Sequence, residues 1–214
     1  LSFLVAMQTA GAMVTSGLYR RILIVSSEQG SVCRDFSHPE SAVLIGDGAS
    51  AAVVQPTPED DSSELLAHIY RTFPNGAHLA ELRGCGTRAH PNDSATIAQD
   101  NLFRMNGPGI YKMAYRKVER LVDDLLAAAE LTKDDIDLVV PHQASGPALG
   151  ALERMGFASD RVINIVDTVG NCIAASLPMA LHTAMSDDRL QRGDRILMLG
   201  TGAGLSVGGS ILRW

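Results

Sequence analysis

Short apolar runs alternate along the chain with segments in which apolar residues recur every three or four positions. The short runs are typical of buried strands, and the wider spacing is typical of helices that pack one face against a core. Their alternation predicts a layered α/β fold. The predicted strands are 21–26, 42–45, 51–54, 137–140, 162–166, 195–199 and 208–212, and the predicted helices are 1–17, 110–125, 148–155 and 173–185.

The first predicted helix, residues 1–17, is apolar on nearly all sides, which predicts that it is buried. Gly17 is a suitable residue to end it. Nothing in the sequence precedes Leu1 that could cap the free N–H groups of the first turn, although a buried helix start needs such partners. We therefore expect that the sequence begins partway through a fold.

Three regions lack the spacing of a helix or a strand. Residues 56–64 are polar and rich in proline and aspartate, which makes them the best candidate for a linker. Residues 68–108 contain several glycines and prolines and are predicted to be rich in loops. Small residues at 46–50 predict a turn, in which Asp47 is expected to make local hydrogen bonds.

Length, composition and charge narrow the classes of protein that fit. With 214 residues, 46% of them hydrophobic, the chain can bury a sizeable core as one large domain or as two halves. The net charge of −6 argues against a general nucleic-acid surface, because phosphate binding favours a basic face. No run of about 18 uncharged apolar residues occurs, so no membrane span is predicted, and no secretory leader is predicted either.

The cysteines predict neither a disulfide framework nor a metal site. Cys33, Cys85 and Cys172 are odd in number and widely spaced, which fits reduced thiols. The six histidines do not combine with them into a spacing typical of zinc ligands. We therefore expect no bound metal.

Candidate chemistry follows the predicted strands. His142 comes just after the strand at 137–140, Asn171 stands just ahead of the helix at 173–185, and the glycine-rich segment 200–204 follows the strand at 195–199. Ligands of open α/β sheets bind at the carboxyl ends of strands. An imidazole and a carboxamide from neighbouring strand ends can provide two neutral donors, which suits stabilisation of a developing oxyanion.

Each of these residues also has a simpler interpretation. A lone histidine often holds a turn in place, and Asn171 could cap the helix that follows it. Segment 200–204 resembles a dinucleotide-binding loop, but it lacks the lysine of a P-loop, the spacing Gly-x-Gly-x-x-Gly and a following helix. Nucleotide binding is therefore not predicted.

Five segments together resemble one family. The sequence is similar to the thiolase-fold condensing enzymes, specifically the β-ketoacyl-acyl-carrier-protein synthase III group. The matching segments occur in the family's order and cover nearly the whole chain, with residues 56–104 the weakest part. They are Ile45-Gly-Asp-Gly-Ala-Ser-Ala-Ala52, Met105-Asn-Gly-Pro-Gly-Ile-Tyr-Lys112, Pro141-His-Gln-Ala144, Gly170-Asn171 with Ala174-Ala-Ser176, and Gly200-Thr-Gly-Ala-Gly204.

The resemblance implies a thiolase-like duplicated α/β/α/β/α layered fold whose N-terminal half is incomplete. Residues 1–109 would form the remainder of that half with a loop-rich connection, and residues 110–214 the C-terminal half. It also implies a Cys-His-Asn site in which His142 and Asn171 take two of the three positions. The family's cysteine stands directly before a residue such as Leu1, and none of the three cysteines of this chain matches it. Truncation is the expected reason, and a protein without the cysteine is the alternative.

The implied activity is that of an acyltransferase that performs decarboxylative Claisen condensation of an acyl thioester with a malonyl-type thioester, in fatty-acid or polyketide-type biosynthesis. His142 and Asn171 would stabilise the enolate, and the backbone N–H of Ala203 would contribute to an oxyanion site. The residues expected to line the substrate channel are Tyr111, Ala144, Ser145 and Thr201. Acyl transfer to an oxygen or nitrogen acceptor, or a non-catalytic partner subunit, are the alternatives. The fragment alone is expected to be inactive.

The resemblance also implies the partners. Acyl-coenzyme A or acyl carrier protein would supply the substrates, with no cofactor, no nucleic acid and no membrane, in a cytoplasmic homodimer. Ser145 and Pro147 stand where the family usually has an asparagine and a basic residue that engages the carrier protein. Coenzyme A thioesters are therefore the alternative to carrier-protein thioesters as substrates.

Overall fold

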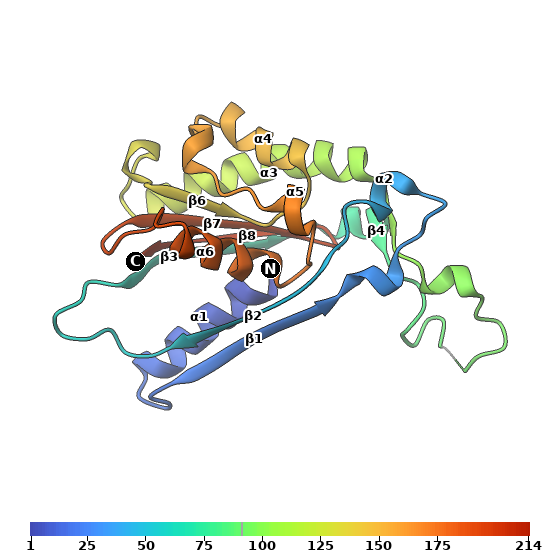
Figure 1. Cartoon of the computed structure of the whole chain (residues 1–214), viewed down its shortest axis with the longest axis horizontal. Helices are drawn as coiled ribbons and strands as arrows, with labels where there is room; N and C mark the ends of the chain where they lie inside the picture. Colours follow the sequence, from blue (N-terminus) through green and yellow to red (C-terminus); the bar gives the residue numbers. More distant parts are fainter. Residues whose placement is uncertain (91) are drawn as a thin grey trace.

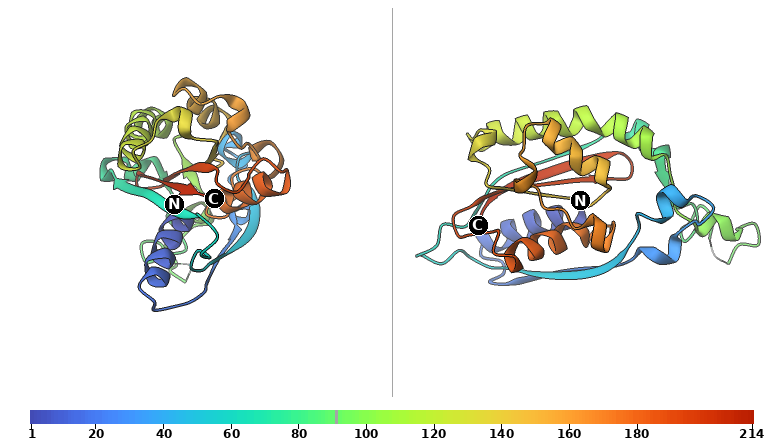
Figure 2. Two further views of the ribbon diagram at one scale, coloured as in Figure 1. Left: turned by 90° about the vertical axis from the view of Figure 1, so that its left-hand side faces the viewer. Right: turned by 45° about the horizontal axis from the view of Figure 1, so that its top comes forward.

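Four layers of secondary structure are stacked in the order sheet, helices, sheet, helices (Figures 1 and 2). The structure is a computed structural model that describes residues 1–90 and 92–214. The longer helices are α1 (Ser2–Thr15), α3 (Gly107–Ala128), α4 (Gly146–Arg154) and α6 (Ser176–Ser186), with single turns at α2 (Pro39–Ala42) and α5 (Val166–Val169). Short 3-10 turns occupy Gly30–Cys33, Pro74–Leu79, Ala98–Asn101, Lys133–Asp135 and Ser159–Arg161.

The larger sheet has four strands in the order β3-β8-β7-β6. Strands β6 (Leu138–Pro141) and β7 (Arg195–Gly202) are parallel, whereas β8 (Ser206–Arg213) is antiparallel to β7 and to β3 (Glu64–Thr72). All four residues of β6 are buried, because helices cover both faces of this sheet. Burial on both faces explains why the central strands are continuous apolar runs in the sequence.

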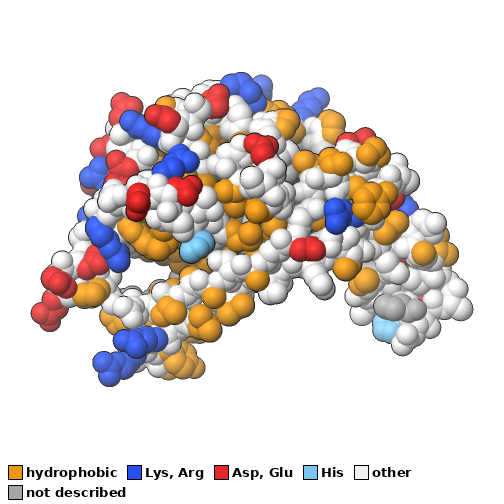
Figure 3. All heavy atoms as spheres, in the orientation of Figure 1, with side chains coloured by type: hydrophobic (Ala, Val, Ile, Leu, Met, Phe, Trp, Pro, Cys, Tyr) orange, Lys and Arg blue, Asp and Glu red, His pale blue; other side chains and the backbone are white. Residues whose placement is uncertain are grey.

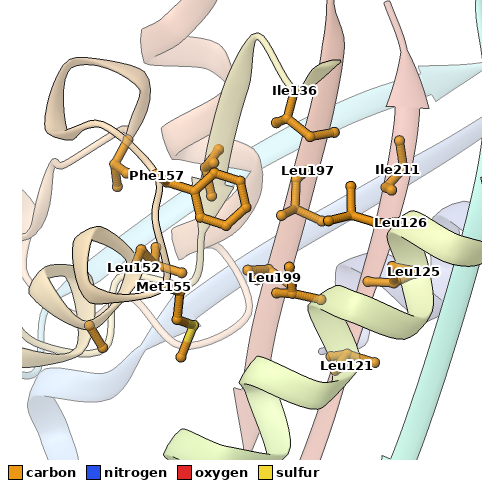
Figure 4. Close-up of a cluster of buried hydrophobic side chains, with 14 of the residues drawn as sticks. Leu121, Leu125, Leu126, Ile136, Leu152, Met155, Phe157, Leu197, Leu199 and Ile211 are labelled. Carbon is orange, nitrogen blue, oxygen red and sulfur yellow. The ribbon is translucent and has the colours of Figure 1, made fainter. Parts of the chain in front are cut away.

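Helices α3 and α4 cover the outer face of the four-stranded sheet. Leu121 and Leu125 of α3 point at Leu197 of β7 and Ile211 of β8, and all four side chains are fully buried (Figure 4). Helix α3 begins at a capped turn, in which the Asn106 side-chain oxygen accepts a 2.9 Å hydrogen bond from the Gly109 N–H. This arrangement fixes the start of α3 at one end of the sheet.

Helices α1 and α6 form the layer between the two sheets. Phe3 and Leu4 of α1 share a buried cluster with Leu177 of α6 and with Ile196 and Met198 of β7. The predicted burial of the first helix is only partly confirmed, because Val5 and Met13 of α1 are exposed. The order helix, strand, antiparallel strand occurs at α1–β1–β2 and again at α6–β7–β8, as expected for a duplicated fold.

The second sheet consists of two antiparallel strands, β1 (Ile22–Gln29) and β2 (Asp47–Val54). One of its faces contacts α1 and α6, whereas Leu23, Val25 and Val53 on the other face are each more than 60% exposed. Figure 3 shows these strands as a band of hydrophobic side chains along the lower side of the molecule. This sheet therefore presents an uncovered apolar face.

Two strand predictions were wrong. Residues 42–45 do not form a strand, because the chain turns through α2 at Pro39–Ala42 and only Ile45 makes an isolated bridge. At 162–166 only Val162 makes a bridge, to Val139, and the chain continues into α5. A side chain prevents a longer ladder there, since the Gln143 amide takes the hydrogen-bonding groups of the neighbouring backbone.

The turn predicted at 46–50 was also wrong. Residues 47–50 belong to strand β2, which pairs with β1 from Asp47 onward. Asp47 does not bond locally, because its carboxylate accepts hydrogen bonds from the N–H and the hydroxyl of Ser31, at 2.8 and 2.6 Å. These bonds hold the pKa of Asp47 below its ordinary value.

The region 68–108 is only partly rich in loops. Its first residues continue β3, whereas the only regular elements among the described residues of 73–106 are 3-10 turns and the two-residue strands β4 (Ala80–Glu81) and β5 (Arg104–Met105). The proposed division of the chain at 109/110 stays a prediction, and β3 from the first part pairs with β8 of the second. In the described ranges, the structure contains no helix with the length and apolarity needed to cross a membrane.

Candidate active site

A cavity of about 1160 Å³ opens where the start of α1 meets the end of β6, the β7–β8 hairpin and the first turn of α3. Leu1 lies in its wall, and much of the remaining lining is apolar. All the site residues predicted from the sequence line this one cavity: Tyr111, His142, Ala144, Ser145, Asn171, Thr201 and Ala203. Residues from segments far apart in the sequence thus meet around one space.

His142 directly follows strand β6. Its backbone N–H donates a 2.7 Å hydrogen bond to the Leu199 carbonyl, which continues the pairing of β6 with β7 by one residue. Burial is the largest cause that lowers the pKa of His142 from its ordinary value to about 4. The imidazole is therefore neutral at neutral pH and can donate one hydrogen bond through a ring N–H.

Gln143 holds the turn that carries His142. Its fully buried side-chain nitrogen donates to the carbonyls of Pro141 and Ile163, at 2.8 and 3.1 Å, and its oxygen accepts a 2.8 Å bond from the Ile165 N–H. Three bonds from one buried amide fix the backbone on both sides of His142. No role was predicted for Gln143, although it belongs to the segment Pro141-His-Gln-Ala144 that resembles the family.

The peptide of Asn171 is clamped between two residues of the segment before β2. Its N–H donates to the Leu44 carbonyl at 2.6 Å, and its carbonyl accepts from the Gly46 N–H at 3.0 Å. Gly46 permits this approach, because a Cβ there would lie 2.0 Å from the Val169 carbonyl oxygen. Gly170 adopts φ 71° and ψ −161°, a backbone conformation open essentially only to glycine.

The Asn171 side chain does not cap α6. That helix begins at Ser176 without a side-chain cap, and the Asn171 Oδ1 atom instead accepts a 3.0 Å bond from the Ile173 N–H. With its oxygen engaged in this way, the amide has its Nδ2 group left to donate. Because Asn171 lines the cavity, a bound carbonyl could receive that hydrogen bond.

The glycines of the β7–β8 hairpin allow the start of α1 to approach the sheet. A Cβ on Gly200 would lie 3.1 Å from the Leu1 side chain, and a Cβ on Gly208 would lie 3.0 Å from it. Gly204 adopts φ +121° in the turn beside Ala203. The small residues therefore let α1 pack closely against the sheet, and they also keep the backbone of the β7–β8 loop accessible to the cavity.

The other predicted residues form the cavity walls. Tyr111 lies in the first turn of α3, where its hydroxyl accepts a hydrogen bond from Arg154 of α4 and its ring lies 6.1 Å from that of Tyr115. Ser145 precedes α4 as its N-cap residue but makes no side-chain cap bond. Thr201 lies near the end of β7. Ala144 follows His142 in the same turn, where its backbone N–H donates a 2.9 Å hydrogen bond to the His142 carbonyl.

The three cysteines are free, as predicted. Cys33 lines the cavity, and burial raises the pKa of its thiol. Cys172 is buried, donates to the Asp47 and Val169 carbonyls, and also has a pKa raised by burial. A thiol with a raised pKa is a poor nucleophile, so neither of these two cysteines is suited to attack a thioester.

The start of α1 is better suited to hold a thiolate than the surroundings of Cys33 or Cys172. The first N–H groups of a helix lack partners within the helix, and Leu1, directly before this helix of 14 residues, lies in the cavity wall. The helix dipole places positive partial charge at the same point. A thiolate held there would be stabilised, and it would lie in the same cavity as His142 and Asn171.

Two family models match the chain. The model of 3-oxoacyl-[acyl-carrier-protein] synthase III matches residues 1–72, and the model of the C-terminal part of the same enzymes matches residues 126–214. Among curated proteins, the β-ketoacyl-[acyl-carrier-protein] synthases III of Synechocystis sp. and Allorhizobium ampelinum are 35% and 33% identical to this chain. The match covers 99% of this chain and 64% of each relative, so the chain spans just under two thirds of their length.

Solved structures of the same enzymes are also similar to this chain. The β-ketoacyl-[acyl-carrier-protein] synthase III of Thermus thermophilus is 33% identical, with a TM-score of 0.86 over 99% of this chain and 64% of that structure. The 3-oxoacyl-(acyl carrier protein) synthase III of Pseudomonas aeruginosa is 28% identical, with a TM-score of 0.89 over the same shares. The chain therefore belongs to the 3-oxoacyl-[acyl-carrier-protein] synthase III family of thiolase-like condensing enzymes.

Proposed function

We propose that the intact protein carrying this chain catalyses decarboxylative Claisen condensation of an acyl thioester with a malonyl-type thioester, in fatty-acid type biosynthesis. One observation carries the proposal. A single cavity brings together a neutral imidazole, a carboxamide whose Nδ2 group can donate and the N-terminal end of a helix. Family membership supports the same reaction.

The first half-reaction loads the acyl group. A cysteine thiolate directly before Leu1 would attack the carbonyl carbon of the acyl thioester and expel the carrier as its thiolate. The start of α1 favours the thiolate through its dipole and unpaired N–H groups. Covalent attachment divides one difficult transfer into two easier steps. Neither His142 nor Asn171 is required as a proton acceptor in this step.

The second half-reaction forms the new nucleophile. The malonyl thioester loses carbon dioxide, and the electrons of the broken C–C bond move onto the thioester oxygen to give an enolate. His142 donates a ring N–H and Asn171 donates an Nδ2–H to that oxygen. Both donors are neutral, the imidazole is buried and the Asn171 amide is held by the Ile173 N–H, so both can act where negative charge develops. Removal of one such donor commonly costs roughly 3 kcal/mol of barrier, about a hundredfold or more in rate.

Carbon–carbon bond formation completes the cycle. The enolate carbon attacks the acyl carbonyl, and the resulting oxyanion is received by the Ala203 backbone N–H together with that of the cysteine. Collapse of the tetrahedral intermediate breaks the C–S bond and returns the thiolate. Tyr111, Ala144, Ser145 and Thr201 contact the thioester arm, and no cofactor takes part.

Coenzyme A or acyl carrier protein would bring the substrates, and the intact protein would be a homodimer. The relatives are named as synthases that act with acyl carrier protein, which supports that carrier. The uncovered apolar face of β1 and β2, at Leu23, Val25 and Val53, supports further burial of this half in the intact protein.

Release of carbon dioxide tests the proposed reaction. The intact protein is supplied with an acyl thioester and carboxyl-labelled malonyl thioester, and the labelled gas and the β-ketoacyl product are measured. Equal amounts of both are expected. Efficient formation of an ester or amide from an alcohol or amine acceptor, without release of carbon dioxide, would replace condensation by simple acyl transfer.

A further inference from the structure

Ile173 has an unusual backbone conformation beside Asn171. Its φ angle is +50°, in the left-handed region. Among the described non-glycine residues with positive φ, Ile173 alone has a β-branched side chain. Such a conformation crowds the branched side chain against the backbone and costs about 1–3 kcal/mol. Strain of this size persists only where the surrounding structure enforces it.

Contacts on both sides enforce the conformation. Before Ile173, the Asn171 peptide is held by Leu44 and Gly46, and the buried Cys172 thiol donates to the Asp47 and Val169 carbonyls at 3.2 and 3.3 Å. After it, the Ala175 N–H donates to the Cys172 carbonyl at 2.9 Å and leads into α6. The chain must turn within one residue between these two anchored parts.

The turn directs the Ile173 N–H at the side-chain amide of Asn171. The Ile173 N–H points back at the Asn171 Oδ1 atom, 3.0 Å away, and this bond determines which end of the amide is left to donate. The Ile173 side chain is 45% exposed and lines the cavity, and its tip would lie 3.1 Å from a Cβ on Gly30. Backbone and side chain of this residue therefore face the same site.

We propose that Ile173 is a positioning residue, whose strained backbone holds the Asn171 amide with Nδ2 toward the cavity. The inference rests on the proposed function of Asn171 as an enolate donor. Without the Ile173 N–H, the amide can rotate by half a turn and present its oxygen to the enolate oxygen. The partial negative charge of the amide oxygen repels the enolate oxygen, so the rotated amide destabilises the enolate that it would otherwise stabilise.

A double-mutant cycle in the intact protein tests this role. Ile173→Pro removes the N–H and cannot adopt positive φ, and Asn171→Ala removes the amide. Each single variant is expected to lower malonyl-thioester decarboxylation about a hundredfold. The double variant is expected to be no slower than Asn171→Ala by more than about twofold, because Ile173 acts through the amide. Acylation of the thiol by the acyl thioester should stay within about threefold in all three variants, a pattern that general misfolding would not produce.

Asp188 provides the matched control. It also has positive φ, at 56°, and its N–H donates to the Met185 carbonyl, but it lies in the exposed turn after α6. Asp188→Pro imposes the same backbone conflict away from the cavity and should leave decarboxylation per folded molecule unchanged. Ile173→Gly keeps the N–H and accepts positive φ, so it should recover most of the rate that Ile173→Pro loses.

The outcomes separate this inference from the proposed function. Full decarboxylation by Asn171→Ala would overturn both. A slow Asn171→Ala variant combined with a fast Ile173→Pro variant would overturn the positioning role alone, as would a double variant about a hundredfold slower than either single one. If Ile173→Pro does not fold, the same cycle uses the α-hydroxy acid analogue of isoleucine at 173, which removes only the N–H.

Discussion

Substitution His142→Ala in the intact protein is expected to slow malonyl-thioester decarboxylation at least about a hundredfold, while thiol acylation keeps nearly its normal rate. The ring is neutral because burial lowers its pKa to about 4, so it acts as a hydrogen-bond donor and carries no charge. Loss of one fixed donor to a developing oxyanion costs roughly 3 kcal/mol. Labelled carbon dioxide release and single-turnover acylation, measured separately, report the two steps.

His182→Ala is the matched control for this substitution. His182 is exposed on α6, contacts Ser186 and does not line the cavity. Both half-reactions should proceed normally in that variant. Equal losses in both half-reactions of His142→Ala would contradict the assigned division of labour, since they would make the imidazole the base that activates the thiol.

Substitution Gly46→Ala is expected to lower the free energy of unfolding by about 3 kcal/mol and to slow decarboxylation strongly. The added Cβ would lie 2.0 Å from the Val169 carbonyl oxygen, which is backbone and cannot rotate away. Relief of this overlap requires the Asn171 peptide to leave its position beside Gly46. Chemical denaturation measures the first effect, and carbon dioxide release from the folded fraction measures the second.

Gly11→Ala is the control for the added methyl group. Gly11 lies within α1, and a Cβ there meets no atom within 4 Å. Alanine should therefore stabilise the helix by about 0.5–1 kcal/mol and leave decarboxylation unaffected. A Gly46→Ala variant as stable and active as Gly11→Ala would show that the Asn171 clamp has no structural importance.

The buried strands and amphipathic helices could be predicted from the sequence because their burial patterns are simple. Strand β6 and residues 196–199 of β7 are apolar, since helices cover both faces of their sheet, and α3 shows a regular apolar stripe. Strand β2 was misread because its small residues suggest a turn. In the structure, Gly48 is small because Met179 and Cys172 pack against it, with a Cβ there only 2.5 Å from the Met179 sulfur.

Part of the candidate site could also be predicted, and part could not. The cavity-lining positions of His142 and Asn171 followed from their places after predicted strands and from the family resemblance. The residues that hold His142 and Asn171 in place show no local pattern in the sequence that reveals this role. Gln143 acts through backbone groups about twenty residues away, and the φ angle of Ile173 depends on contacts with the segment before β2. Such tertiary constraints have no periodicity that a single sequence displays.

A crystal structure of the intact protein with a malonyl thioester analogue that cannot lose carbon dioxide tests the central claim most directly. The thioester carbonyl oxygen should lie about 3 Å from both a ring nitrogen of His142 and the Nδ2 atom of Asn171, beside the start of α1. A carbonyl oxygen that contacts neither group, or an Asn171 amide that presents its oxygen to the ligand, would contradict it.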